Sequence, residues 1–297
     1  MRRTAAPGRP KQGPTLSEGL AVSGERGVVM TPRSYLFVPG NRPERFDKAL
    51  ASGADAVIVD LEDAVPPDQK DAARRHLSAW LSVARPVVVR INAADTPWHR
   101  DDLALCRQPG VSAVMVAKAE RADRLAAREL DDVPLLPLIE SAAGFDQLRA
   151  IAAVRGVQRL AFGAIDFQLD MRMRAEFDEL IYFRSQLVLA SRLAGIAPPV
   201  DSPSVAIDDS AEVERDAQRA RRLGFGAKLC IHPRQLVAVN RSFSASEAER
   251  AWARRVLAIA ESSGGAAVAL DGQMIDKPVI LRAQAILAEA RSVDAVG

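Results

Sequence analysis

Charged and polar side chains follow the apolar segments of this chain at the points where those segments end. Six of eight short runs rich in Val, Ile, Leu and Ala finish on such residues. The residues concerned are Asp60, Glu62, Asp63, Arg90, Asn92, Lys118, Glu140, Ser141, Asp166 and His232. A single residue of this kind would be typical of a helix cap or a surface ion pair. Six segments that end in the same way indicate one shared site.

The carboxylates in this set predict a divalent cation. Acidic groups gathered at one place repel each other unless a cation neutralises them. Three histidines and two cysteines are present, but without the HxxxH or CxxC pair that would indicate zinc. Carboxylate oxygens with water suit Mg²⁺, or Mn²⁺ as a substitute. The spacing leaves open which carboxylates bind directly, although Glu140 and Asp166 follow consecutive segments and can therefore reach one ion.

Arg90 and His232 each have two interpretations. Arg90 follows three valines and is expected to point into the same site. There its guanidinium would clamp a substrate carboxylate through two hydrogen bonds, or form a structural ion pair with Glu62 or Asp63. His232 is more typical of a buried, hydrogen-bonded strand end than of a metal ligand.

Eight apolar segments must position these residues. They cover 34–38, 56–62, 86–92, 113–118, 135–141, 160–166, a weak segment at 198–205, and 227–233. Helical periodicity lies between them, for example over 68–81, 175–193 and 209–223. Strands that are apolar throughout are typical of parallel sheets covered by helices on both faces. Eight such units favour an α/β fold closed into a (β/α)8 TIM barrel over an open sheet, with the site at the carboxyl ends of the strands.

The two ends of the chain differ from this pattern. Residues 1–30 are rich in Arg, Gly, Pro and Ser, which predicts a disordered N-terminal tail. We place the barrel at 31–243. Residues 244–297, with helices expected over 244–262 and 279–291, form a C-terminal helical extension that covers a rim of the barrel or reaches a neighbouring subunit.

Composition and charge limit the partners. Of the 297 residues 48% are hydrophobic and 26% charged, as in an ordinary globular protein. The net charge of +2 includes +4 from residues 1–33, which hold six Lys/Arg and two Asp/Glu, so the remainder carries −2. This balance argues against binding to nucleic acid.

No apolar stretch approaches the ~18 residues of a membrane span. Cys106 and Cys230 are isolated, consistent with free thiols in the cytoplasm.

Six segments, in this order along the chain, resemble the HpcH/HpaI aldolase and citrate lyase family, in particular its citrate lyase β-subunit-like members. They are RSYLFVPGNRPERFDKALASGADAVIVDLEDAV (33–65), VVVRINAADTPWHRDDL (87–103), PLIESAAGF (137–145), FGAIDF (162–167), GAKLCIHPRQ (226–235) and LDGQMIDKP (270–278). The resemblance runs from about Arg33 to Ala290. It implies a TIM barrel that binds Mg²⁺ and assembles as a homotrimer or hexamer.

The resemblance also implies roles for individual residues. The metal ligands would be Glu140 and Asp166, and the Glu62 and Asp63 carboxylates would hold metal-bound waters. Arg90 would bind the carboxylate of the oxo-acid. Asp276 would enter the active site of a neighbouring subunit as the acid/base. The loop from Pro39 to Arg42, with Asn41 and Arg42 as substrate-binding residues, would lie near the coenzyme A tail.

The sequence departs from the family pattern in two places. The common GAED-L-x-x-D-L-G becomes GAIDFQLDMR, which loses an acidic residue beside Asp166 and a glycine where Arg172 stands. The DG turn after the seventh strand is Asp201-Ser202. Neither change removes an implied metal ligand, but both alter the wall of the site and leave the substrate open.

The function that the resemblance implies is a Mg²⁺-dependent carbon–carbon lyase. It would cleave, or form by condensation, a hydroxyacyl-CoA thioester such as citryl-, malyl- or citramalyl-CoA, with an oxo-acid and an acyl-CoA as the other partners. Hydrolysis of the thioester after condensation would make the same site a synthase. The alternatives are a class II aldolase that needs no coenzyme A, and a β subunit that works only beside partner citrate lyase subunits.

Overall fold

The computed structural model describes residues 31–125, 130, 133–262, 268–270 and 272–294. Among them, eight parallel strands close into a barrel in chain order. The strands are β1 (Ser34–Pro39), β2 (Ala56–Asp60), β3 (Val87–Ile91), β4 (Val111–Val116), β5 (Leu135–Ile139), β6 (Arg159–Phe162), β7 (Ala197–Asp201) and β8 (Ala227–Cys230). The barrel closes where β8 pairs with β1, with Ser34 beside Lys228. The predicted TIM barrel is confirmed, and the predicted tail at 1–30 lies outside the described residues.

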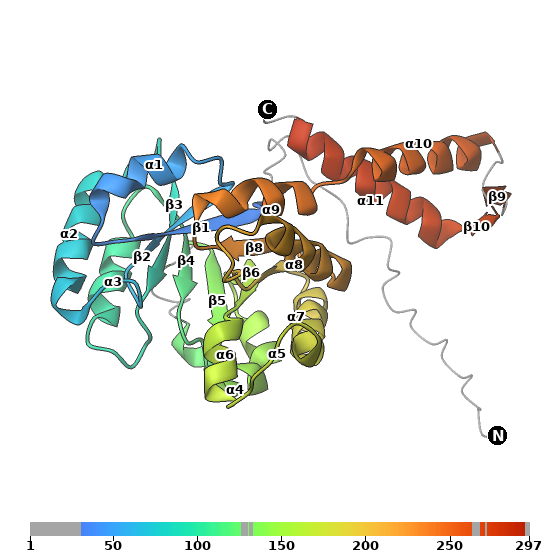
Figure 1. The fold of residues 1–297 in the computed structure, drawn as a ribbon. Coiled ribbons are helices and arrows are strands. Elements are labelled where there is room, and N and C mark those ends of the chain that lie inside the picture. The colour runs from blue at the N-terminus through green and yellow to red at the C-terminus, as the bar shows by residue number, and fades with distance from the viewer. Residues whose placement is uncertain (1–30, 126–129, 131–132, 263–267, 271, 295–297) are drawn as a thin grey trace, which may run out of the picture. The chain divides into compact units, whose positions relative to one another are not determined.

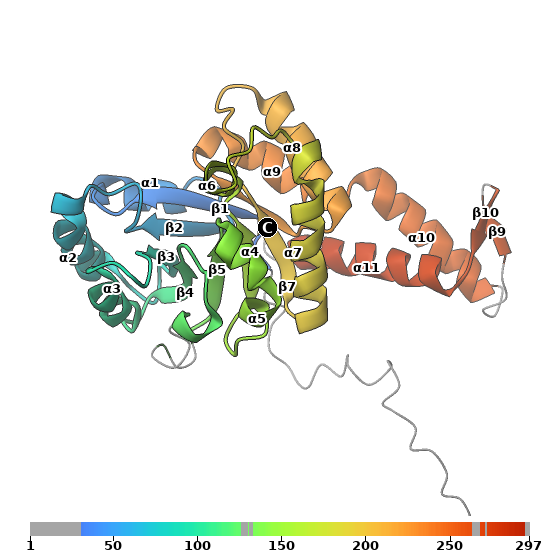
Figure 2. The same ribbon diagram turned by 90° about the horizontal axis from the view of Figure 1, so that it is seen from below.

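Helices cover the outside of the barrel (Figures 1 and 2). They are α1 (Phe46–Leu50), α2 (Lys70–Trp80), α3 (His99–Cys106), α4 (Ala142–Asp146), α5 (Leu148–Ala152), α6 (Ala164–Asp170), α7 (Ile181–Ala194), α8 (Ser210–Leu223) and α9 (Leu236–Ser242). The sequence marks the ends of α8 well: the Asp209 carboxylate accepts from the Glu212 backbone N–H, and Gly224 takes the left-handed conformation at the other end.

The strands are apolar throughout because both of their faces are buried. On β2, Ile58 packs inside the barrel with Met115, Leu138 and Leu229. Its neighbours Val57 and Val59 belong to the larger core between the strands and the helices. A strand that loses water on both sides cannot alternate apolar and polar residues. This explains why the sequence pattern located the strands.

After the barrel the chain forms a helical hairpin. Helices α10 (Glu247–Ser262) and α11 (Lys277–Asp294) pack on each other, and the short antiparallel strands β9 (Val268–Leu270) and β10 (Gln273–Ile275) lie between them in the chain. The pair has a small core of its own that includes Ala253, Val256, Ala283 and Ile286. Figures 1 and 2 show β9 and β10 at the end of the helix pair that is remote from the barrel.

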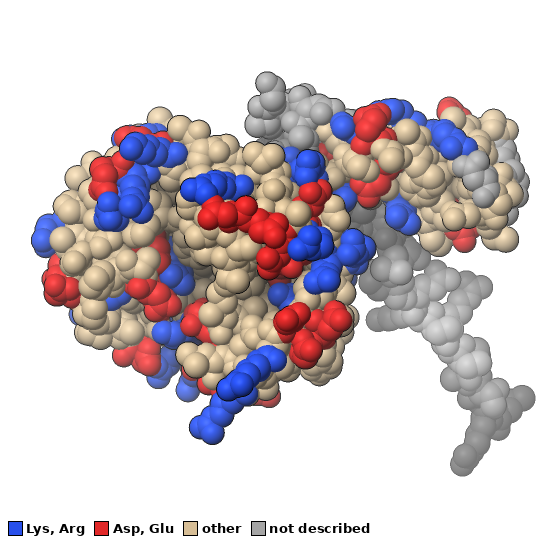
Figure 3. Space-filling model, in the orientation of Figure 1, with Lys and Arg blue, Asp and Glu red and all other residues tan. Residues whose placement is uncertain are grey.

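Charges are mixed on the surface. On the face shown in Figure 3, acidic and basic side chains lie next to one another over the barrel helices and over α10 and α11. Such interspersed charge is typical of a solvated surface. In the described part of the chain no helix combines the length and apolarity needed to cross a bilayer.

Arg172 is one of two described non-glycine residues with positive φ, at 53°, and follows Met171, the residue that caps α6. A residue with a Cβ atom in this left-handed backbone conformation is strained by about 1–2 kcal/mol. Glycine avoids this strain, but it makes the unfolded chain more flexible, which offsets part of the gain in stability. We expect Arg172→Gly to raise the free energy of unfolding by roughly 0.5–1 kcal/mol, measured by urea denaturation. Arg172→Ala keeps the Cβ atom and serves as the control. Equal stability of the Arg172→Gly and Arg172→Ala variants would contradict the claim that the backbone is strained at this position.

Candidate active site

A cavity of about 300 Å³ opens at the carboxyl ends of the barrel strands. Its charged lining consists of Asp60, Asp63, Arg90, Glu140 and Asp166, which lie on or after strands β2, β3, β5 and β6, Asp166 in helix α6. Apolar side chains and the small residues Gly163 and Ser202 make up the rest of the wall. Four acidic groups and one basic group therefore share one small space. The barrel collects in this cavity five of the residues that the sequence placed at segment ends.

Glu140 is the most deeply buried of these acids. It directly follows β5, is 3% exposed, and its Oε1 accepts a hydrogen bond of 2.7 Å from the backbone N–H of Lys118. Its other side lies against Gly163, where a Cβ atom would stand only 2.7 Å from Glu140 Oε2. Burial raises the pKa of Glu140 to about 8, and the charges on Glu62 and Asp166 add to this effect. A carboxylate held so rigidly among other acids is well suited to a cation.

Asp166 reaches the cavity from a helix rather than from a strand. The sequence predicted that the sixth strand runs to Asp166, and this is wrong: β6 ends at Phe162 and Asp166 lies in the first turn of α6. Gly163 separates the two elements, and an acidic residue in a first turn is favoured by the helix dipole. Asp166 is half-buried, lines the same cavity as Glu140 and interacts with it electrostatically.

Arg90 is held by Asp60, to which the sequence assigned no partner. Its Nε and Nη2 donate to the two Asp60 carboxylate oxygens at 2.7 and 2.6 Å, while Nη1 lies 3.3 Å from Glu62 Oε2. Burial alone would lower the pKa of Arg90, but the Asp60 charge outweighs it and the pKa is raised. A guanidinium has five N–H donors, so donors remain for a further carboxylate. Its position therefore allows Arg90 both to form a structural ion pair and to bind a substrate carboxylate.

Asp60→Ala would leave the Arg90 guanidinium buried without the carboxylate that binds it through two hydrogen bonds, with Glu62 and Glu140 as the remaining nearby acids. Removing one member of a buried ion pair is costly because the other charge stays without compensation. We expect a loss of about 3 kcal/mol in the free energy of unfolding, measured by urea denaturation. The exposed pair of Asp47 and Arg85, 3.1 Å apart, gives the control, since Asp47→Ala should cost less than about 1 kcal/mol. Equal losses in both variants would contradict the argument.

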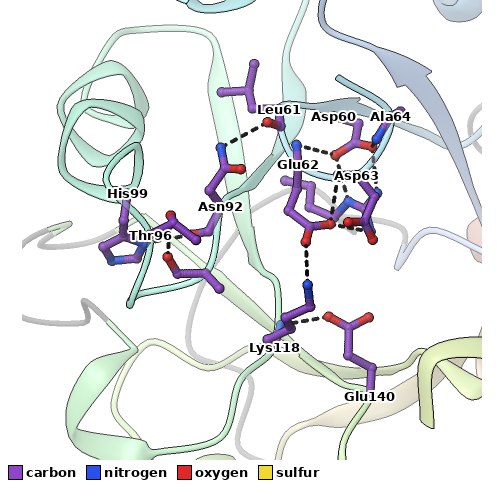
Figure 4. Close-up of polar contacts among 12 residues, drawn as sticks. Asp60, Leu61, Glu62, Asp63, Ala64, Asn92, Thr96, His99, Lys118 and Glu140 are labelled. Atoms are coloured by element: carbon purple, nitrogen blue, oxygen red, sulfur yellow. Dashed lines mark hydrogen bonds and ion pairs between the residues drawn. The ribbon is translucent and has the colours of Figure 1, made fainter. Parts of the chain in front are cut away.

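Glu62 and Lys118 join the second and fourth strands beside the cavity, as Figure 4 shows. Glu62 is 5% exposed, and its Oε1 lies 3.2 Å from Lys118 Nζ. Its Oε2 accepts from the backbone N–H of Asp63 at 2.9 Å. Lys118 has a positive φ of 47°, which aims its own N–H at Glu140. The sequence did not predict the contact between the Lys118 backbone N–H and Glu140, because a lysine at this position does not indicate a positive φ.

Three polar residues of the predicted set have structural roles. Asn92 donates to the Leu61 carbonyl at 2.9 Å and so supports the turn after β2. Ser141 caps α4 through its hydroxyl, which accepts from the Gly144 N–H. His232 accepts from the Arg234 N–H and is half-buried. None of these three lines the cavity.

Asn41, Arg42 and Asp276 also lie outside the cavity lining. Asn41 donates to Gln69 Oε1 at 2.6 Å, and Arg42 pairs with Glu44 at 2.7 Å on the surface. Asp276 is exposed at the start of α11, where it accepts from the Val279 N–H at 3.2 Å. The chain therefore does not bring these residues to its own metal-ligand candidates.

The cavity fits a cation held by two carboxylates. Across the described residues, no group of three or more His, Cys, Asp or Glu side chains is arranged to chelate an ion. Mg²⁺ does not require one, because it keeps several waters and is commonly bound through one or two carboxylates plus substrate oxygens. Glu140 and Asp166 could supply these two ligands. Burial, with a smaller contribution from the Glu62 and Asp166 charges, raises the pKa of Glu140, and a bound cation would favour its charged form.

The fold and the site define a β/α-barrel protein with an acidic, arginine-containing pocket at the barrel mouth. A model of the HpcH/HpaI aldolase/citrate lyase family matches residues 33–233, and the chain belongs to this family. The match makes the protein an enzyme of the lyase kind.

Individual relatives agree with this membership. The citrate lyase subunit beta-like protein of Deinococcus radiodurans is 38% identical over 277 residues, covering 86% of this chain and 96% of that protein. The (3S)-malyl-CoA thioesterase of Cereibacter sphaeroides is 34% identical, covering 89% and 96%. The crystal structure of CitE from Mycobacterium tuberculosis with magnesium, acetoacetate and coenzyme A is similar with a TM-score of 0.79 and 36% identity, covering 87% and 98%.

Proposed function

We propose that the protein is a Mg²⁺-dependent carbon–carbon lyase that acts on a hydroxyacyl-CoA thioester such as a citryl-, malyl- or citramalyl-CoA. The observation that carries the proposal is the meeting of Glu140, Asp166 and Arg90 in one cavity at the barrel mouth. The binding of magnesium, acetoacetate and coenzyme A by a relative 36% identical to this chain supports it.

Glu140 and Asp166 would bind the metal directly, and Glu62 and Asp63 would hold its waters. Bound Mg²⁺, or Mn²⁺ in its place, supplies Lewis acidity for the charge that develops on the oxygen of the oxo-acid half. The Lys118 N–H fixes Glu140 and the Arg90 ion pair orients Glu62, so these two carboxylates need little rearrangement on binding. Such preorganisation is what an electrostatically driven reaction requires.

Arg90 would bind the carboxylate of the oxo-acid half with the donors that Asp60 leaves free. In cleavage, the substrate hydroxyl gives its proton to water, the bond between the hydroxyl carbon and the thioester-bearing carbon breaks, and its electron pair stays on the thioester half, which leaves an oxo-acid and a thioester enolate. Asp276 of the partner subunit would protonate the enolate to the acyl-CoA, or abstract this proton in the condensation. This role requires a homo-oligomer, a trimer or hexamer in which the extension at 244–297 completes a neighbour's site. Asn41 and Arg42 would contact the coenzyme A tail.

A substrate panel tests the proposal. The purified protein, with Mg²⁺ and with EDTA, is assayed on hydroxyacyl-CoA thioesters and on free 4-hydroxy-2-oxo acids. We expect release of an oxo-acid and an acyl-CoA from a thioester only when Mg²⁺ is present. Cleavage of free hydroxy-oxo acids instead would identify a coenzyme A-independent aldolase. Activity that appears only after other citrate lyase subunits are added would identify a dependent β subunit.

Thioester hydrolysis is the second activity to examine. A relative named a (3S)-malyl-CoA thioesterase is 34% identical over almost its full length. Free thiol released from malyl-CoA without an accompanying oxo-acid would show that this chain hydrolyses the thioester rather than the carbon–carbon bond.

A further inference from the structure

A second cavity, of about 480 Å³, adjoins the catalytic cavity. The two cavities share Ile165, Ser202 and Pro203 in their walls. Helices α6, α7 and α8 and the loop after β7 contribute most of the remaining lining of the second cavity. We call it the Arg184 cavity, after the buried arginine that lines it. A ligand of the catalytic cavity therefore has the Arg184 cavity as its immediate neighbour.

Three buried charged residues that line this cavity carry a net positive charge. Lys228 Nζ donates to Asp201 Oδ2 at 2.9 Å, and Arg184 Nε donates to Asp201 Oδ1 at 3.0 Å. Burial would raise the pKa of Asp201, but the charges of Lys228 and Arg184 outweigh it and lower the pKa. Two cations thus share one carboxylate, which leaves an excess of one positive charge. A buried charge is costly unless an opposite charge accompanies it.

The Arg184 guanidinium has donor capacity that the protein does not use. Its side chain is 8% exposed, and Nη1 is buried without a hydrogen-bond partner among the described residues. The ring centres of Phe177 and Phe162 lie 4.7 and 5.6 Å from the Arg184 Cζ atom, so aromatic contacts help to hold the guanidinium in place. A planar, fixed guanidinium with an unused donor at the wall of a cavity is suited to a carboxylate.

The outer part of the Arg184 cavity is not biased toward one sign of charge. Two exposed basic residues and three exposed or half-buried acidic residues line it: Arg215, Arg219, Glu176, Glu212 and Asp216. Water and salt screen charges at such positions, whereas a buried charge is screened much less. The excess positive charge beside Asp201 therefore decides which ligands the Arg184 cavity attracts.

The catalytic cavity offers a second substrate carboxylate much less. Arg90 is the one basic side chain in its described lining, and four acids lie beside it. We propose that the Arg184 cavity is a second carboxylate subsite of the active site. It binds the distal carboxylate of a dicarboxylic oxo-acid, while Arg90 binds the carboxylate next to the oxo group. This inference rests on the proposed function, since it names the substrate class of that site.

Two matched pairs of oxo-acids isolate the second carboxylate. Freshly prepared oxaloacetate is compared with 2-oxobutyrate, and 2-oxoglutarate with 2-oxovalerate, because a methyl group replaces the distal carboxylate within each pair. In calorimetry with Mg²⁺ we expect the dicarboxylic acid to bind at least about tenfold more tightly in at least one pair, as for a charge-assisted hydrogen bond. An advantage below about tenfold in both pairs would overturn the inference and leave the proposed lyase activity intact.

Arg184→Met tests the named residue. Asp201 keeps Lys228 as its partner in this variant, so the buried group becomes neutral and the fold should survive, which the melting temperature checks. We expect the advantage of the dicarboxylic acid to fall at least about tenfold, while the affinity for its monocarboxylic counterpart stays the same. Arg192→Gln, at an exposed position on α7, controls for the loss of an arginine. An undiminished advantage in Arg184→Met would overturn the role of Arg184.

Val205 provides a test that does not depend on a buried substitution. It is 71% exposed and lines the Arg184 cavity but not the catalytic cavity. Val205→Lys and Val205→Glu place opposite charges at the same position. At low ionic strength we expect the advantage of the dicarboxylic acid to be about tenfold larger in the lysine variant than in the glutamate variant. Equal advantages in the two variants would overturn the inference.

A separate acid is the competing source of a carboxylate in the Arg184 cavity. Succinate, which lacks an oxo group, is titrated into the protein saturated with Mg²⁺ and 2-oxobutyrate. Succinate binding that disappears in Arg184→Met would show that the cavity holds an independent acid, and it would overturn the assignment to the substrate. We expect no such binding. If no oxo-acid binds and no thioester is cleaved, the proposed function itself fails, and the inference with it.

Discussion

The Glu140→Gln variant is expected to lose Mg²⁺-dependent turnover by at least about 10³-fold and, at the same time, to be more stable than the wild type when no metal is present. The loss of turnover follows from replacing a charged ligand by a neutral amide. The gain in stability follows from the environment of Glu140, which is 3% exposed and surrounded by other acids. The amide oxygen of glutamine can still accept from the Lys118 N–H.

The sign of the stability effect follows from the pKa of Glu140. Its pKa is about 8 in the folded protein, against 4.5 for an ordinary glutamate. Between these values the folded protein retains a proton that the unfolded chain has lost, so the metal-free wild type becomes less stable as pH rises through this window. Glutamine removes this dependence. At about pH 8 the variant should be more stable by on the order of a few kcal/mol, whereas at about pH 4 the two proteins should be alike.

The same titration predicts how Mg²⁺ binding depends on pH. A carboxylate ligand must lose its proton, so binding releases one and the affinity weakens as pH falls below about 8. The measurements are urea denaturation in EDTA across this pH range and calorimetric titration with Mg²⁺. Glu261→Gln, at an exposed position on α10, controls for removal of a carboxylate elsewhere. Unchanged Mg²⁺ affinity in Glu140→Gln would remove Glu140 from the metal site, and equal metal-free stability at about pH 8 would contradict the raised pKa.

Sequence patterns predicted the barrel because its strands are buried on both faces. All eight strands fall within or beside the apolar segments, including β7, whose Pro198 and Pro199 made its segment weak. The long helices α2, α8, α10 and α11 were also located to within a few residues, whereas α7 begins at Ile181, six residues after the predicted start at 175. Short helices such as α4, α5 and α6 were not identified, because five to seven residues carry too little periodicity.

The sequence selected five of the residues that line the cavity but not the contacts between them. The rule that barrel sites lie at strand ends selected Glu140 and Arg90 without any structural information. The pairing of Arg90 with Asp60 depends on the register of β2 against β3, which places these two residues side by side. Register is set by the closed sheet as a whole, so neither the sequence of β2 nor that of β3 contains it.

The position of Asp276 raises the question of whether one chain alone forms a complete active site. Asp276 caps α11 on the helical hairpin and does not line the cavity. We expect Asp276→Asn to lower turnover by about 10³-fold while Mg²⁺ affinity stays unchanged, because asparagine cannot transfer the proton. Asparagine is as good a helix cap as aspartate, so this variant should keep the wild-type stability, whereas Asp276→Ala should also lose about 1 kcal/mol.

A complementation experiment then decides whether Asp276 acts in the active site of its own chain or in that of a neighbouring chain. Asp276→Asn supplies an intact metal site, and Glu140→Gln supplies an intact Asp276. If each site takes its barrel from one subunit and its Asp276 from the next, co-assembled mixed oligomers contain sites free of both substitutions. Random assortment of equal amounts makes about a quarter of the sites intact, so about a quarter of wild-type turnover should return. Mixed oligomers with no more activity than the two parents would show that Asp276 does not serve a neighbour's barrel, and the extension would then need another role.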